Sequence, residues 1–131
     1  MKINLVSIPV LDQDKALKFY TEKLGFILNK DVPVGNSDRW LTLVSPEWPD
    51  GPEILLEPSP NNFEPSKFYQ ESLMEAGIPY TQLEVYSVDT EFKRLINQGI
   101  NFNVEPTEIG PVKIAVFNDT CGNLIQIIEH I

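Results

Sequence analysis

The chain has 131 residues, 42% of them hydrophobic and 22% charged, as in a globular protein that can bury a core. Its formal net charge of −9 argues against nucleic acid and anionic membranes as partners, because phosphate recognition needs basic patches. No apolar run reaches the roughly 20 residues of a membrane span, and the start shows no signal-peptide pattern. Its single cysteine excludes an internal disulfide. We therefore expect a cytoplasmic protein.

The first part of the chain alternates strand and helix patterns. Apolar residues predict a strand at 4–10, and Asp12 then caps a helix at 15–24 that Gly25 ends. Glycine, asparagine, serine and aspartate predict a turn at 35–38. Two strands are expected on either side of this turn, at 26–34 and 39–45, and a third at 53–57, after the proline-rich loop at 46–52.

The same pattern begins again after residue 79. A polar connection at 58–65 and a helix at 66–76 come first. The repeated pattern then consists of a strand at 80–86, a helix at 88–98 and strands at 101–104, 113–117 and 123–129. The turn before the last strand contains Asn118, Asp119, Gly122 and Asn123, residue types that predict a β-hairpin.

The order of elements is therefore β-α-β-β-β twice. Val10 corresponds to Val85 at an offset of 75 residues, and Gly25 corresponds to Gly99 at 74. We expect a single domain over 1–131, with repeat 1 at about 1–57, a connection and extra helix at 58–79, and repeat 2 at about 80–131. The predicted class is α+β, with two βαβββ modules forming a cup-shaped mixed sheet and the helices outside.

Two motifs resemble one known family. The second motif covers 119–126, and the first combines, at fixed spacing, Val10, Asp12, Ala16, Phe19, Tyr20, Leu24, Gly25 and Phe26. Together they resemble the glyoxalase/bleomycin-resistance/extradiol-dioxygenase superfamily, also called vicinal oxygen chelate proteins. The resemblance implies paired subunits. It also implies either a metal-dependent enzyme, such as an isomerase, epimerase, ring-opening dioxygenase or thiol transferase, or a metal-free protein that sequesters antibiotics.

The metal site of the family separates these two possibilities. The resemblance places the four metal-ligand positions on Leu5, Leu55, Tyr80 and Gln126. Only Gln126 among them could bind a metal, as a weak neutral oxygen ligand, whereas a divalent ion needs three or four such groups. We expect no bound metal and no other cofactor, although a divalent metal stays possible.

Six residues are candidates for contact with a ligand: Gln126, Tyr80, Leu5, Leu55, Glu57 and Trp40. Gln126 is either a hydrogen-bonding group in a pocket or a satisfied structural amide. Tyr80 and Trp40 offer a phenol and a stacking surface, or else pack in the core or in a dimer. Glu57 is an acid near the mouth of the cup or a solvated carboxylate at a strand end.

The favoured function is metal-free binding of a small apolar or aromatic molecule in the cup, by a cytoplasmic homodimer. The alternative is a metal-dependent lyase, isomerase or ring-cleaving dioxygenase of the same superfamily. No catalytic residue is identified. Cys121 lies in a turn where partial exposure is expected, without a recognisable base, and His130 is expected at the surface near the end of the chain.

Overall fold

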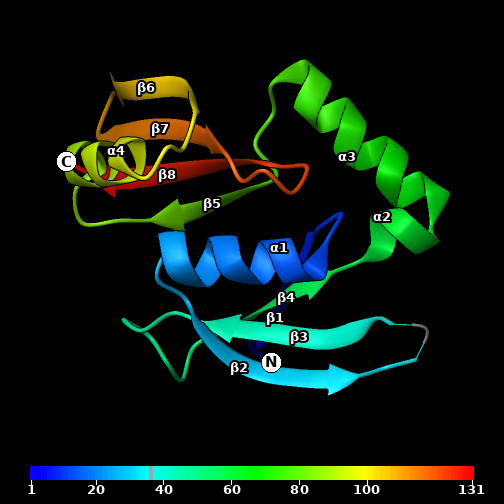
Figure 1. Cartoon of the computed structure of the whole chain (residues 1–131). Helices are drawn as coiled ribbons and strands as arrows, with labels where there is room; N and C mark the ends of the chain where they lie inside the picture. Colours follow the sequence, from blue (N-terminus) through cyan, green and yellow to red (C-terminus); the bar gives the residue numbers. More distant parts are fainter. Residues whose placement is uncertain (36) are drawn as a thin grey trace. The chain divides into compact units, whose positions relative to one another are not determined.

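The computed structural model describes residues 1–35 and 37–131, and these divide into two compact units, residues 1–68 and 69–131. Each unit contains a four-stranded mixed sheet and the helix of one βαβββ module (Figure 1). The prediction of an α+β fold built from two similar modules is confirmed. Asn36, inside the turn expected at 35–38, lies outside the described residues.

The first sheet has the strand order β1-β4-β3-β2, in which β1 and β4 pair in parallel and the other neighbours are antiparallel. Its elements lie close to their predicted positions. They are β1 (Leu5–Pro9), α1 (Gln13–Lys18), the π-helical turn η1 (Phe19–Lys23), β2 (Ile27–Pro33), β3 (Arg39–Val44) and β4 (Glu53–Glu57).

The helix expected at 15–24 is a short α-helix continued by a π-helical turn. Asp12 caps it as predicted, because its carboxylate accepts a hydrogen bond from the Lys15 amide at 3.0 Å. In the wider turn two neighbouring rings, Phe19 and Tyr20, are both buried and meet edge to face. Gly25, with φ +90°, ends the helix in a conformation that favours glycine.

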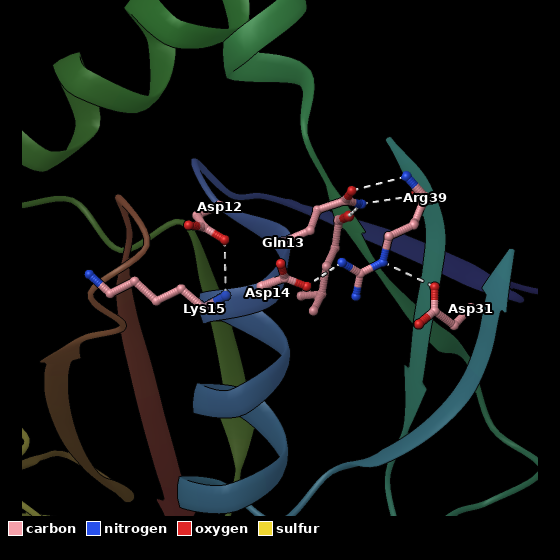
Figure 2. A network of polar contacts seen from close by, with 7 residues as sticks. Asp12, Gln13, Asp14, Lys15, Asp31 and Arg39 are labelled. Carbon is pink, nitrogen blue, oxygen red and sulfur yellow. Dashed lines mark hydrogen bonds and ion pairs between the residues drawn. The ribbon is translucent and has the colours of Figure 1, made fainter. Parts of the chain in front are cut away.

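The buried side chain of Gln13 joins β3 to β4, a contact that the sequence did not predict (Figure 2). Its Nε2 donates to the carbonyl oxygens of Arg39 and Leu56, at 2.7 and 2.9 Å. Its Oε1 accepts from the Arg39 amide at 3.0 Å. The glutamine amide thus supplies the hydrogen bonds that a neighbouring strand would otherwise provide.

Arg39 shows which side of the first sheet carries α1. Its guanidinium donates to Asp14 on α1 and, at 3.1 Å, to Asp31 on β2 (Figure 2). These two partners raise its pKa, against the opposing effect of burial. Strand alternation places Arg39 with Leu41 and Leu43, so α1 covers this side and Trp40 and Thr42 point to the opposite side.

The second sheet repeats the arrangement, with the order β5-β8-β7-β6 and a parallel pair between β5 and β8. Its elements are β5 (Thr81–Glu84), α4 (Val88–Asn97), β6 (Phe102–Ile109), β7 (Val112–Asn118) and β8 (Leu124–His130). The ring of Phe102 contacts Phe92 of α4 on one side and Phe117 of β7 on the other. Helix α4 therefore covers the side of the sheet that carries Phe117.

Two predicted boundaries were wrong, and proline is the reason in both cases. The connection at 58–65 contains α2 (Ser59–Asn62) and the start of α3 (Glu64–Ala76), because Pro60 and Pro65 occupy first-turn positions that need no amide hydrogen. Strand β6 continues past Pro106 to Ile109, since it is an edge strand whose register shifts between Val104 and Thr107.

The hairpin predicted before the last strand is confirmed by the antiparallel pairing of β7 with β8. The buried carboxylate of Asp119 accepts from the amides of Cys121 and Asn123, at 2.7 and 2.9 Å. Gly122 has φ +107°, and a Cβ atom there would lie 2.7 Å from the Gln70 side chain of α3. Backbone conformation and close packing both require glycine at this position.

No helix within the described ranges is long and apolar enough to cross a membrane.

We predict that Gln13→Ala lowers the free energy of unfolding by roughly 2–4 kcal/mol, because it strands two carbonyl groups and one amide of neighbouring strands. Urea unfolding followed by circular dichroism measures the change. Asp14→Ala is the matched control, since its side chain is 81% exposed and an exposed ion pair contributes less than about 1 kcal/mol. Equal losses in both variants would contradict the role assigned to the Gln13 amide.

Candidate functional site

The first module gathers four predicted ligand contacts on one side of its sheet. Parallel pairing of β1 with β4 sets Leu5 beside Glu53, and antiparallel pairing sets Thr42 beside Leu55. Side-chain alternation then defines one surface opposite α1. We call it the first face, and its residues are Leu5, Trp40, Thr42, Glu53, Leu55 and Glu57.

Burial varies across the first face. Thr42 and Leu55 are buried, Leu55 with 4% exposure, and they form its floor. Leu5 and Glu57 are half-buried, and Trp40 is 40% exposed. An apolar floor with an accessible indole suits contact with a flat apolar molecule.

Glu53 lies at the centre of a polar cluster that the sequence did not predict. Its Oε1 accepts from the Thr42 hydroxyl at 2.8 Å and from the Asn29 amide, and its Oε2 lies 3.5 Å from Lys30 Nζ. The hydrogen bonds from Thr42 and Asn29, more than the charge of Lys30, lower the pKa of Glu53. Alternation in β4 placed Glu53 with Leu55, but its partners come from strands distant in sequence.

Glu57 has the opposite environment on the same face. Its side chain has no hydrogen bond or ion pair with any residue in the described part of the chain. Burial raises its pKa above the usual 4.5, and the charge of Asp38 adds to the increase. Glu57 is therefore a half-buried acid on the same face as Trp40, with a carboxyl group open to an incoming donor.

The second module places Gln126 and Tyr80 on one side of its own sheet. Parallel pairing sets Gln82 beside Gln126, and β7 sets Val116 beside Gln126 on the other flank. Because Phe117 points toward α4, these residues point away from it. We call this surface the second face, and its residues are Tyr80, Gln82, Val116, Leu124, Gln126 and Ile128.

Gln126 has a side-chain partner, but among the described residues only for one of its two polar atoms. It is therefore not a fully satisfied structural amide, one of the two possibilities that the sequence left open. It is half-buried, and its Nε2 donates to Oε1 of the exposed Gln82 at 2.5 Å. Tyr80 is also half-buried, and its ring meets that of Tyr69 edge to face at 6.3 Å. Burial raises the pKa of the Tyr80 phenol, so it stays a neutral donor at physiological pH.

The residues at the expected metal-ligand positions do not fit a divalent cation. Leu5 and Leu55 have no donor atom, and the Tyr80 phenol is held in its protonated form. Among residues 1–35 and 37–131, no three His, Cys, Asp or Glu side chains gather closely enough to hold a metal ion. The Glu53 carboxylate beside Leu5 is already bonded to Thr42 and Asn29.

Cys121 lies in the turn before β8, outside both faces, and His130 lies at the far end of β8, on the same side as Gln126. The expectation of partial exposure for Cys121 was wrong: it is 1% exposed, because the Asp119 and Asn123 hydrogen bonds fold the turn around it. A buried thiol of this kind is a packing group rather than a nucleophile. His130 is exposed, as predicted, with its Nε2 3.5 Å from Glu84 Oε1.

Two βαβββ modules, each with its first and last strands paired in parallel, define the class of glyoxalase-fold proteins. The model of the Glyoxalase/Bleomycin resistance protein/Dioxygenase superfamily matches residues 2–127. The chain belongs to this superfamily, as its two motifs predicted.

Relatives match over almost the full length of the chain. The uncharacterised protein YurT of Bacillus subtilis (strain 168) is 54% identical over 129 residues, which are 98% of this chain and 99% of YurT. The crystal structure of UcmS2 is 32% identical, with a TM-score of 0.82 and 98% of each chain covered. TnmS3, an antibiotic-binding protein from Streptomyces sp. CB03234, is 25% identical with a TM-score of 0.75, covering 100% of this chain and 97% of TnmS3.

We predict opposite pH effects from the two acids of the first face. Because the folded state raises the pKa of Glu57, the free energy of unfolding falls as pH rises from 4.5 through the raised value. Glu57→Gln removes this loss, so the variant should gain stability relative to wild type as pH rises from 4.5 through the raised pKa of Glu57. Urea unfolding at several pH values measures the difference.

Glu53→Gln is the matched control. The folded state lowers the pKa of Glu53, so its stabilising contribution is present above 4.5 and is lost as pH falls through the lowered value. This variant should be less stable than wild type at neutral pH, by an amount that shrinks in acid. Changes of the same sign in both variants would contradict these assignments.

Proposed function

We propose that this protein binds a small apolar or aromatic molecule, without a metal ion, on the faces of its sheets that point away from α1 and α4. One feature of the sequence carries the proposal: at three of the four positions that the resemblance assigns to metal ligands, the residues are Leu5, Leu55 and Tyr80, which offer no good metal-ligand atoms. An apolar surface at those positions favours contact with a ligand over coordination of an ion.

The comparison with TnmS3 supports the same function. TnmS3 is an antibiotic-binding protein, and its fold extends over the whole of this chain. A superfamily scaffold of this size therefore serves to hold a small molecule in at least one relative. For the present chain we propose the same general activity.

Each predicted residue has a proposed role. On the first face Leu5 and Leu55 contact apolar atoms, Trp40 stacks on a ring, and Glu57 accepts a hydrogen bond at the edge. On the second face, Tyr80 and Gln126 supply polar contacts to a molecule held mainly by Val116 and its apolar neighbours.

We expect Trp40→Ala to weaken binding of a neutral aromatic probe, N-phenyl-1-naphthylamine, roughly 3–10-fold through loss of ring stacking. A fluorescence titration measures the dissociation constant. Trp48→Ala is the matched control: this second tryptophan is 64% exposed and lies in the loop between β3 and β4, where its ring packs against Gly51. An equal effect of both substitutions, or no saturable binding to wild type, would contradict the proposal.

Chelation tests the metal-free part of the proposal. With no structural or catalytic ion, excess EDTA should leave both the melting temperature and the probe affinity unchanged, because a bound metal stabilises the fold by linkage. Elemental analysis of the purified protein should find no stoichiometric zinc, nickel, iron or manganese. One ion per chain, lost with EDTA together with stability, would instead favour a metal-dependent lyase, isomerase or dioxygenase.

We also propose that the chain acts as a cytoplasmic homodimer. Strand β2 is the edge of the first sheet, and all seven of its residues are exposed, a liability that pairing with a second copy would remove. Sedimentation velocity at micromolar concentration should give twice the mass of one chain. A single species with the mass of one chain would contradict the dimer.

A further inference from the structure

Gln82 and Gln126 form a pair of amides on the second face. They occupy the same rung of the parallel pair β5–β8, and both side chains point away from α4. Gln126 Nε2 lies 2.5 Å from Gln82 Oε1. The pairing of the two strands holds the side chains next to each other, so the hydrogen bond between the amides forms between groups that are already in place.

A single hydrogen bond leaves this pair with one free group at each end. The amide hydrogens of Gln82 and the carbonyl oxygen of Gln126 have no partner among the residues that the structure describes. The result is the same if both amides are turned over, because one glutamine must donate and the other accept. The pair always presents a free NH₂ group and a free C=O group on adjacent strands.

The surroundings make this arrangement selective. Val116, Leu124 and Ile128 are buried beside Gln126, so a ligand seated there contacts mainly apolar surface. The ionisable side chains on the same side of β5 and β8 are Glu84 and His130, which lie at the far end, with His130 Nε2 3.5 Å from Glu84 Oε1. A neutral ligand that offers both an acceptor and a donor satisfies both ends of the glutamine pair, and leaves no buried polar group unpaired.

We infer that the Gln82–Gln126 pair recognises a cis-amide edge, as in a lactam or an imide, on a planar neutral ligand, and that Gln82 is a specificity-determining residue. This inference rests on the proposed small-molecule binding and names the chemical class of the ligand. The ligand carbonyl accepts from Gln82 Nε2, and the ligand N–H donates to Gln126 Oε1. No proton is transferred and neither glutamine titrates, so this contact is independent of pH.

Three bicyclic probes of nearly equal size separate the polar contact from the apolar one. The lactam 2-quinolone offers an acceptor and a donor, the lactone coumarin offers only acceptors, and naphthalene offers neither. Dissociation constants come from titrations followed by ¹⁵N–¹H spectra, in which the side-chain NH₂ signals of Gln82 and Gln126 are observed directly. Wild type should bind 2-quinolone about tenfold more tightly than coumarin, the difference expected for about one additional buried hydrogen bond.

Gln82→Leu should reduce this ratio to about one, because the free donor is lost and Gln126 loses its partner. Gln82→Glu keeps the side-chain length and the bond from Gln126 but has no donor, so it should reduce the ratio even if the leucine variant folds poorly. Asn103→Leu is the matched control: it removes an exposed amide from β6, at the other edge of the same sheet, and should keep the tenfold ratio.

The outcomes distinguish this inference from the proposed function. If the probes bind but the ratio in wild type is near one, or if it survives Gln82→Leu and Gln82→Glu, the recognition of a cis-amide is wrong and apolar binding stands. If none of the three probes binds to wild type, both the inference and the proposed function are overturned.

Discussion

The parallel pairing between the first and last strand of each module determines which side of the sheet Leu5, Leu55 and Gln126 face. In a parallel pair, partners on the same rung point to the same side of the sheet. The rung Leu5–Glu53 therefore places a carboxylate beside a position where the sequence resemblance predicts a metal ligand, and the rung Gln82–Gln126 creates an amide pair. A slip of one residue would turn these side chains toward α1 or α4 and bury the charge of Glu53.

In the first module this register is supported by a side chain from outside the sheet. Gln13 bonds to Arg39 and Leu56, so β3 and β4 are held together through α1 beyond their direct pairing at Thr42 and Leu43. The region near Trp40 and Glu57 lies next to this bridge. One buried amide thus supports the position of β3 relative to β4, and its burial is tolerated because its polar atoms are bonded.

The two faces have different chemistry although the modules share a fold. On the first face, hydrogen bonds to Glu53 lower its pKa while desolvation of Glu57 raises its own, so two acids on one strand differ in readiness to take a proton. The polar groups that we assign to ligand contact on the second face are the two glutamine amides and the Tyr80 phenol, and the phenol stays protonated because burial raises its pKa. The scaffold fixes positions, and the residues at those positions decide the chemistry.

The sequence alone was sufficient to predict the repeated βαβββ order, the Asp12 cap, the final hairpin and the superfamily. These features depend on residues close together in the chain, such as alternating apolar residues, capping side chains and turn residues. Alternation also placed Leu55 and Glu57 on one side of β4. Local patterns failed where proline occurs at a helix start or in an edge strand, because the effect of proline depends on whether its neighbours need an amide hydrogen.

Contacts between segments far apart in sequence were decided only by the tertiary structure. Gln13 meets Leu56 across 43 residues, Gln126 meets Gln82 across 44, and Thr42 with Asn29 converts Glu53 into a bonded carboxylate. An uncharged amide leaves no periodic pattern in a sequence, and its partner is defined by strand register rather than by spacing. The sequence could therefore nominate Gln126 as a polar group in an apolar strand, but only the pairing of β5 with β8 identified Gln82 beside it.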